Sequence, residues 1–371
     1  MPAGHSQATA PRVLILSASI GEGHDLPARV LAEGIREAEP GAEVQIQDFL
    51  ALIRPVLRRI IMGGSQFHSE WGARMFDLEF KLMTEVRPTI WFAGRFMMAT
   101  GARGTERAVA AARPDVIVST YPGATEVLGQ LRRRGRIHVP IVSAITDLAA
   151  LRYWAHPEVD LHLITHPESE EEVRSIAPAS EIVCARGMTD PSFYVKRDAA
   201  DARRALDLPV DAPVVLVSGG GWAVGDLAGA IEAAIAADGT TAVCLTGRNE
   251  AVRQELARRY DGNDRVVILG FSDRMAELMA AADVLVHSTA GLTVLEALME
   301  GCRVISYGWG HGHVRVNNEA YRRFGLARVV TDRDELRPAL RDALAETRAP
   351  DRSFESLPDA ASLVLDAARR S

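Results

Sequence analysis

A glycine-rich turn with a histidine follows the first apolar run of the chain. The run RVLIL leads directly into SASIGEGH, so Gly21 and Gly23 lie just before His24. Glycine lets a backbone approach a bound molecule closely, and histidine can accept a proton near neutral pH. His24 is therefore the first candidate for a general base acting on a hydroxyl. The structural alternative is that His24 only hydrogen-bonds its own loop.

The same turn matches part of a dinucleotide-binding fingerprint. Gly21 and Gly23 supply the first two glycines, but Leu26 stands where the third is needed. Asp48 ends the next strand-like run, where an NAD site has its ribose carboxylate. A dehydrogenase therefore stays open as an alternative.

Two turns in the second half of the chain are suited to phosphate. In VVLVSGGG, the backbone N–H groups of Gly219, Gly220 and Gly221 follow a strand-like run and precede a helical pattern, which favours an anion site. No Gly-Lys-Ser/Thr follows, which excludes a Walker loop. The second turn is HSTAG, and Glu296, one turn into the next helix, could accept two ribose hydroxyls or be a solvated carboxylate.

Arg248 ends a further strand-like run, in LTGRN. It could pair with a phosphate in bidentate fashion, or it could be a surface arginine. Together the two turns and Arg248 favour a nucleoside diphosphate as the ligand.

Metal and cofactor chemistry are not expected. Asp332 and Asp334 form an Asp-x-Asp pattern, but Asp332 also suits the N-cap of the following helix. The cysteines are Cys184, Cys244 and Cys302, far apart and without metal-ligand spacing, which indicates reduced thiols. We predict no metal and no cofactor.

The elements that must position these residues form two similar halves. Apolar runs flanked by glycine alternate with helical periodicity, which predicts two doubly wound, Rossmann-like α/β domains facing a cleft. The expected domains are 1–190, which contains the glycine-rich turn with His24, and 191–335, which contains the two phosphate turns. Residues 336–371 are expected to form closing helices.

Charge and hydropathy limit the location and the partners. The net charge of −7 argues against nucleic acid, and no apolar run is long enough to span a membrane. We expect a cytoplasmic protein. Residues 51–113 nevertheless hold ten basic residues, five acidic ones and seven of the 21 aromatics. This segment is either a helical insertion on the core or a patch that lies on an anionic membrane surface.

Taken together, the motifs resemble the GT-B glycosyltransferases of family 28. The resemblance covers Arg12 to about Leu326. It rests on SASIGEGH, RPDVIVSTYP, TDL followed by YWAHPEVDLHLITHPE, GMTDPSF, VSGGG, LTGRNE, GFSDRMAELMAAADVLVHSTAGLTVLEALMEG and NNEA. The branch with monogalactosyldiacylglycerol synthases and processive diacylglycerol glucosyltransferases is the most similar, because TDL followed by Trp154 and His156 is its usual pattern.

The resemblance implies an inverting, metal-independent enzyme whose UDP-sugar is held by the second domain. On the acceptor side it implies Gly21, Gly23, Trp154 and His156, with His24 as general base and Asp147 as its orienting partner or substitute. The implied donor-binding residues are Gly219, Gly220, Gly221, Arg248, Phe271, Met275, Ser288, Gly291, Thr293, Glu296, Asn317 and Asn318.

Two departures leave the sugar open. The chain has Ser288-Thr289-Ala290-Gly291 where the family commonly has Lys-Pro-Gly-Gly, and GHGHVRVNNEA where it commonly has Gly-Gln-Glu before an asparagine. His311, His313, Asn317 and Asn318 are the local substitutes.

The expected function is transfer of a hexose from a UDP-sugar to a lipid hydroxyl, with diacylglycerol as the acceptor, at the inner face of the cell membrane. Three alternatives stay open: a soluble or polyprenyl-linked acceptor, a UDP-sugar epimerase, and a UDP-sugar-binding regulator without turnover.

Overall fold

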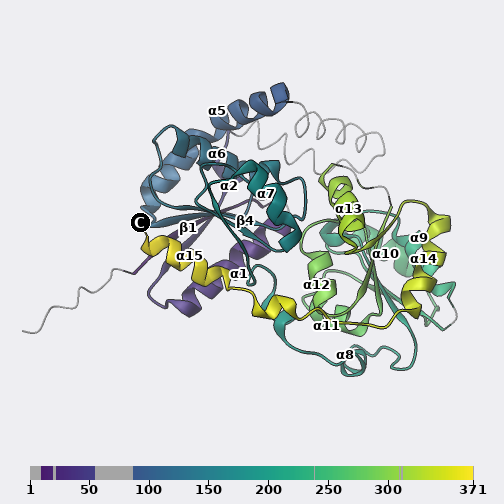
Figure 1. The fold of residues 1–371 in the computed structure, drawn as a ribbon. Coiled ribbons are helices and arrows are strands. Elements are labelled where there is room, and N and C mark those ends of the chain that lie inside the picture. The colour runs from purple at the N-terminus through teal and green to yellow at the C-terminus, as the bar shows by residue number, and fades with distance from the viewer. Residues whose placement is uncertain are drawn as a thin grey trace, which may run out of the picture.

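The computed structural model describes residues 10–19, 22–54, 87–237, 239–308, 310 and 312–370, and only the backbone of residues 87–93 and 313. These residues form two parallel β-sheets of six strands each, with helices on both faces of each sheet (Figure 1). The predicted fold class, two doubly wound α/β units, is confirmed. Gly21 and His311 lie outside the described residues.

The first sheet has the strand order β2-β1-β3-β4-β5-β6. Its strands are β1 (Arg12–Ser17), β2 (Glu43–Asp48), β3 (Val116–Ser119), β4 (Ile141–Ile145), β5 (Leu161–Ile164) and β6 (Glu181–Cys184). The helices in this part of the chain are α1 (Glu22–Ala38), α2 (Phe49–Leu52), α5 (Arg87–Ala112), α6 (Pro122–Arg133) and α7 (Glu170–Ile176), with 3₁₀ turns η1 (Leu151–Tyr153) and η2 (Pro167–Ser169).

The second sheet has the strand order β12-β11-β10-β7-β8-β9. Its strands are β7 (Val214–Ser218), β8 (Thr241–Leu245), β9 (Val266–Leu269), β10 (Val284–His287), β11 (Arg303–Tyr307) and β12 (Arg328–Val330). The helices are α8 (Ala199–Ala205), α9 (Leu227–Ile235), α10 (Glu250–Arg259), α11 (Met275–Ala281), α12 (Thr293–Met299), α13 (His313–Phe324), α14 (Arg333–Ala345) and α15 (Ala360–Arg369), with 3₁₀ turns η3 (Pro191–Tyr194), η4 (Gly220–Trp222) and η5 (Ser353–Ser356).

Continuous apolar runs form the central strands because both faces of each sheet are buried. In β1, Val13 and Ile15 join the core under α1 and α15, whereas Leu14 and Leu16 join the core under α2, α5 and α6. Alternate residues of a strand point to opposite faces, so a sheet covered on both sides needs apolar residues at every position.

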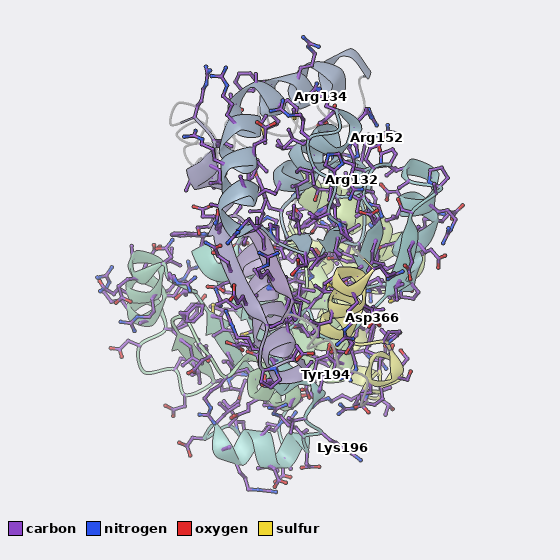
Figure 2. The ribbon with its side chains drawn as sticks, turned by 90° about the vertical axis from the view of Figure 1, so that its left-hand side faces the viewer. Arg132, Arg134, Arg152, Tyr194, Lys196 and Asp366 are labelled. Carbon is purple, nitrogen blue, oxygen red and sulfur yellow. The ribbon has the colours of Figure 1, made fainter. Side chains whose placement is uncertain are left out.

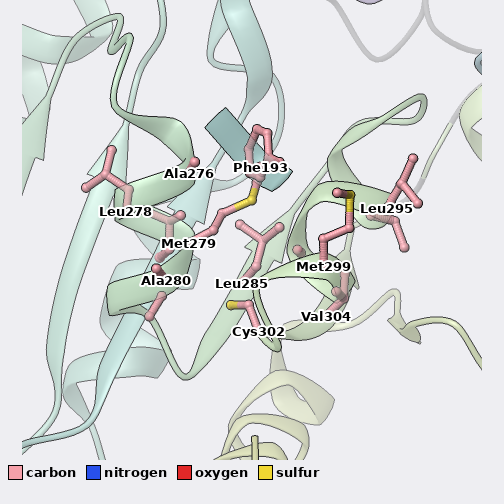
Figure 3. Close-up of a cluster of buried hydrophobic side chains, with 14 of the residues drawn as sticks. Phe193, Ala276, Leu278, Met279, Ala280, Leu285, Leu295, Met299, Cys302 and Val304 are labelled. Carbon is pink, nitrogen blue, oxygen red and sulfur yellow. The ribbon is translucent and has the colours of Figure 1, made fainter. Parts of the chain in front are cut away.

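The second sheet follows the same rule. Figure 3 shows one of its two cores, in which Phe193 of η3 packs with Met279 of α11, Leu285 of β10 and Met299 of α12. Cys302 lies in the same core, and burial raises the pKa of its thiol to about 12. A buried thiol of this kind stays protonated and is therefore a poor nucleophile.

The last helix returns to the first sheet. α15 lies beside α1 in Figure 1, and Ala361 lies against Gly34 of α1. The backbones of Arg186 and Pro358 also pair where the chain crosses back. The predicted boundary at residue 190 lies between β6 and β7, and of the predicted closing helices α14 packs against the second sheet and α15 against the first.

Each sheet has a point where the strand order reverses, and the sequence motifs follow these strands. β1 pairs with β2 on one side and β3 on the other, and β7 pairs with β8 and β10. In open α/β sheets, ligands bind beyond the carboxyl ends of the strands at such a point. The GEGH turn follows β1, SGGG follows β7 and HSTAG follows β10.

The basic aromatic segment of residues 51–113 lies mostly outside the described residues. In its described part, Phe96 stays exposed on α5, and α5 packs against α2 and α6. Figure 2 labels three nearby basic side chains, Arg132 and Arg134 at the end of α6 and Arg152 in η1. Among the described residues, no helix is long and apolar enough to cross a membrane.

Candidate functional site

His24 belongs to the first turn of α1, which begins at Glu22, so residues 22–24 of the predicted glycine-rich turn are helical. Pro27 lies inside this helix, and a proline cannot donate a hydrogen bond to the carbonyl four residues before it. That carbonyl belongs to Gly23, and the hydroxyl of Thr146 donates to it at 3.3 Å instead. The hydroxyls of Ser17 and Thr120 both donate to the carbonyl of His24.

The imidazole of His24 is oriented by the end of β3. Its Nδ1 lies 3.0 Å from the carbonyl oxygen of Thr120. A carbonyl can only accept, so Nδ1 carries the hydrogen and Nε2 carries the lone pair of the neutral ring. The ring meets Tyr121 edge-on at 5.2 Å and lies 5.5 Å from the ring of Trp154. Nε2 is therefore the nitrogen that could accept a proton.

Asp147 is connected to this cluster through Trp154. The indole N–H of Trp154 donates to Asp147 Oδ2 at 3.0 Å, and the indole is almost fully buried. The structure therefore brings together His24, Trp154 and Asp147, but the side-chain bond of Asp147 goes to Trp154 and not to His24, so its role as orienting partner or substitute stays a prediction. Thr120, which the sequence analysis did not single out, supplies the orienting contact to His24.

His156 occupies a different environment from the other predicted acceptor residues. Its side chain is 4% exposed, and its Nδ1 accepts a hydrogen bond from the backbone N–H of Glu158. It packs against Gly129 of α6, where a Cβ would overlap the ring. Burial lowers the pKa of His156 to about 4, so the ring is neutral. These contacts describe a packed core histidine that shapes the region behind Trp154.

The turn after β7 differs from the prediction in one respect. SGGG was expected to open a helix, but it forms the short turn η4, and α9 begins only at Leu227. Ala223 and Gly225 have positive φ values, which reverse the chain between the turn and the helix. Asp226 caps α9 by accepting from the Gly229 N–H. An anion at this turn would therefore meet the glycine backbone and not the end of α9.

Close backbone packing joins this turn to the one after β8. Gly220 and Gly247 have φ values of +65° and +56°. A Cβ on Gly247 would lie 2.5 Å from the carbonyl oxygens of Gly220 and Gly221. The N–H of Arg248 donates to the Gly221 carbonyl at 2.8 Å, so the two turns form one surface.

Arg248 stands on this surface and faces the first half of the chain. Its guanidinium lies 4.2 Å from the ring centre of Phe271, which is 54% exposed. Its Nη2 pairs with Glu22 Oε1 at 2.6 Å. Burial raises the pKa of Glu22, but hydrogen bonds and charge from Arg29 and Arg248 outweigh it and lower the value. Glu22 is a residue that sequence reasoning missed, although it lies inside the quoted GEGH motif.

The turn after β10 lies beside the same surface. A Cβ on Gly220 would meet Thr289, and one on Gly225 would meet the hydroxyl of Ser288. The Ser288 hydroxyl donates to the carbonyl of Tyr307 at 3.1 Å, and Gly291 has a φ of +83°. α12 then begins at Thr293, so Glu296 lies one turn into the helix, as predicted.

Glu296 is buried, which excludes the solvated-carboxylate alternative. It is 8% exposed, and the hydroxyl of Thr189 donates to its Oε1. Burial raises the pKa of Glu296 to about 7, Thr189 lowers it and the charge of Asp190 raises it. A carboxylate that already accepts one hydroxyl has the chemistry needed for ribose. Thr189 is a second residue that sequence reasoning missed.

The last predicted donor residues lie in different places. Met275 begins α11, packs against the core of the second sheet, and lies near Phe271 in sequence. Asn317 is fully buried, and its Oδ1 accepts from the backbone N–H groups of Leu148 and Ala149. Asn318 Oδ1 accepts from the hydroxyl of Ser306 at 2.7 Å. Both amide oxygens therefore bond to protein groups.

Two acidic alternatives from the sequence have structural explanations. Asp48 accepts from the N–H of Leu50 and is the N-cap of α2, which removes the observation that kept the dehydrogenase alternative open. Asp332 occupies the N-cap position of α14, as interpreted from the sequence. Within the described residues, no group of three or more His, Cys, Asp or Glu could hold a metal ion.

Comparison with known proteins identifies the class. Residues 24–188 match the family model for monogalactosyldiacylglycerol (MGDG) synthase, and residues 213–346 match the model for glycosyl transferases group 1. The chain is 24% identical to a processive diacylglycerol beta-glucosyltransferase of Bacillus mycoides over 333 residues, which cover 88% of this chain and 84% of the relative.

Solved structures agree on the fold. Acinetobacter baumannii MurG has a TM-score of 0.59 at 14% identity, with 97% of this chain and 99% of that chain covered. Arabidopsis thaliana UGT89C1, solved in complex with UDP, has a TM-score of 0.55 at 13% identity, with 97% and 99% covered. This chain is a glycosyltransferase of the GT-B fold. More particularly, the matches confirm its resemblance to the family 28 enzymes and their glycolipid-synthase branch.

Proposed function

We propose that this protein transfers a hexose from a UDP-sugar to the hydroxyl of diacylglycerol, with inversion at the anomeric carbon. One observation carries the proposal: the turn that holds His24 and the glycine turns of the second sheet meet across the Glu22–Arg248 contact. An acceptor beside His24 and a donor on the glycine turns would then lie against each other. The Bacillus relative, named as a diacylglycerol glucosyltransferase, supports the lipid acceptor.

On the donor side, the diphosphate would bind against the backbone of Gly219, Gly220 and Gly221, and it would take the Gly220 N–H from the Ser218 hydroxyl to which that N–H now donates. Arg248 would neutralise it, and Glu296 would accept the ribose hydroxyls in place of Thr189. Donors aimed at the departing diphosphate stabilise the charge that develops in the transition state. The UDP complex of the structurally similar Arabidopsis protein supports a nucleotide at this fold.

On the acceptor side, Nε2 of His24 would take the proton of the lipid hydroxyl. The oxygen then attacks the anomeric carbon from the face opposite the diphosphate, and the bond from that carbon to the diphosphate oxygen breaks. UDP leaves with the electron pair and the sugar inverts. Thr120 holds the His24 ring in the required tautomer, and Trp154 and Asp147 support it from behind.

The test is a donor-by-acceptor screen with purified protein. UDP-glucose, UDP-galactose and UDP-N-acetylglucosamine are each incubated with diacylglycerol vesicles, with a polyprenyl-linked acceptor, with a soluble acceptor and with no acceptor. Products are identified by mass spectrometry, and UDP affinity is measured by calorimetry. We expect one donor to yield a β-linked glycolipid, and the His24→Ala variant to lose about 10²–10⁴-fold in turnover while its UDP affinity is kept.

Each other outcome has a distinct meaning. Transfer only to a soluble or polyprenyl-linked acceptor would overturn the lipid assignment. Interconversion of UDP-sugars without acceptor would indicate an epimerase, and tight UDP binding without any product would indicate a regulator. Full turnover in the His24→Ala enzyme would remove this residue from the base role.

A further inference from the structure

Asn317 makes a contact between the two halves of the chain that no donor-binding role requires. Its side chain is fully buried, and Oδ1 accepts from the backbone N–H of Leu148 at 3.0 Å and of Ala149 at 3.3 Å. Two consecutive backbone N–H groups that share one oxygen fix both the position and the direction of a loop. Asn317 belongs to α13 of the second half, whereas Leu148 and Ala149 follow β4 of the first.

The loop that Asn317 holds is anchored on both sides. The side chains of Leu148 and Ala149 belong to the core of the second half, together with Tyr321, one turn after Asn317 on α13. The remaining polar contacts of the loop go to the first half: the Ser169 hydroxyl donates to the Leu148 carbonyl at 2.9 Å. The loop therefore bridges the two halves.

The conformation of this loop needs support from outside. Ala150 has a φ of +63°, a left-handed conformation that a residue with a Cβ rarely adopts. Such a conformation persists only where the surrounding structure holds it. The two residues that donate to Asn317, Leu148 and Ala149, directly precede Ala150. Their hydrogen bonds therefore restrain the strained residue from its N-terminal side.

The loop also carries Asp147, which links it to the acceptor site. Asp147 accepts from the indole of Trp154, and the ring of Trp154 lies beside His24. Burial raises the pKa of Tyr321, and the charge of Asp147 raises it further. Asn317 bonds to the two residues that directly follow Asp147, so this loop connects α13 to the acceptor site.

We propose that Asn317 is a positioning residue, which holds the loop of residues 147–149 so that Asp147, Trp154 and His24 keep their place opposite the donor turns. It acts through the loop and does not touch the sugar. The proposal rests on the proposed transferase function for its kinetic consequence, but its structural consequence is independent of that function.

The test compares Asn317→Leu, which removes the acceptor oxygen, with Asn317→Asp, which keeps one. Hydrogen exchange is followed at the amides of Leu148 and Ala149, and UDP affinity is measured by calorimetry. We expect Asn317→Leu to lose at least about tenfold in protection at both amides and in kcat, with the UDP Kd and the donor KM within twofold of wild type. Asn317→Asp should restore the protection.

Ser180→Ala is the control, because it removes a buried hydrogen bond between a side chain and the backbone that does not involve this loop: the Ser180 hydroxyl donates to the Val159 carbonyl within the first half. It should leave exchange at residues 148 and 149 unchanged. If Asn317→Leu does not fold, Asn317→Ala is measured in the same way.

Unchanged protection in the leucine and alanine variants, or a tenfold rise in the UDP Kd with kcat kept, would overturn the proposal. The second result would make Asn317 a donor ligand. If wild-type protein transfers no sugar at all, the proposed function fails, while the exchange rates still decide whether Asn317 holds the loop.

Discussion

At the residue scale, Glu296 shows how burial changes the acidity of a carboxylate for which we propose a ligand. The side chain is removed from water, and Thr189 supplies a single hydroxyl to it. Its pKa of about 7 lies well above the ordinary value of 4.5. Between these two pH values the native protein holds a proton that the unfolded chain has released. Raising the pH through this window therefore destabilises the ligand-free protein.

Glu296→Gln should remove this penalty, because glutamine cannot ionise and its amide oxygen can still accept from Thr189. We expect the variant to be more stable than wild type at pH 8 by up to about 3 kcal/mol, and equally stable below pH 4.5. Urea denaturation at several pH values measures the difference. Glu37→Gln, at an exposed position of α1, is the control. A difference that does not grow with pH would contradict the assignment.

At the scale of elements, the proposed donor surface depends on two turns that pack backbone against backbone. The turn after β8 approaches the turn after β7 so closely that only glycine fits at position 247. Gly247 also has a positive φ, so a side chain there meets both a strained conformation and a steric overlap. The position of Arg248 follows from this packing, because Arg248 is the next residue.

Gly247→Ala should therefore weaken UDP binding by at least about tenfold and reduce the free energy of unfolding by about 1–3 kcal/mol. Gly262→Ala provides a close control, because Gly262 has a φ of +75° but no atom within 4 Å of the added Cβ. This control should show how much the positive φ alone reduces the free energy of unfolding, and it should leave UDP binding unchanged. Calorimetry and thermal unfolding give both values. Equal UDP affinity in the two variants would show that the close packing of the turns is unimportant for the donor.

At the scale of the whole molecule, Glu22 of the first half and Thr189 between the two sheets bond to side chains that a nucleotide would need under our proposal. Glu22 pairs with Arg248 as a phosphate would, and Thr189 donates to Glu296 as a ribose hydroxyl would. Donor binding must then exchange these contacts for its own. In this arrangement, the same groups that we propose for the donor connect the two halves of the chain in the ligand-free protein.

Glu22→Gln should consequently tighten UDP binding, because the loss of the carboxylate releases Arg248. Both side chains are partly exposed, so we expect a gain of at most about fivefold that shrinks at high salt. Arg29→Gln is the control: Arg29 pairs with Glu22 on the same helix, and its removal leaves the pair with Arg248 in place. Weaker UDP binding in the Glu22→Gln protein would show that Glu22 helps the donor and does not compete with it.

The sequence by itself indicated the two α/β units, the turns at the ends of β7 and β10, and the candidate base. These features are local, because apolar runs, glycines and the residues beside them reveal strands and turns without any knowledge of distant contacts. Short β12 escaped prediction, since the three residues Arg328–Val330 at the sheet edge carry too little pattern.

Only the tertiary structure decided which side chains meet. Glu22 and Arg248 are 226 residues apart, and Asn317 bonds to a loop 168 residues before it. The sequence motif around His156 suggested an acceptor ligand, but its neighbours across α6 and β5 make it a core residue. The physical reason is that a side chain's role depends on its burial and its partners, and the packing of elements distant in sequence sets both.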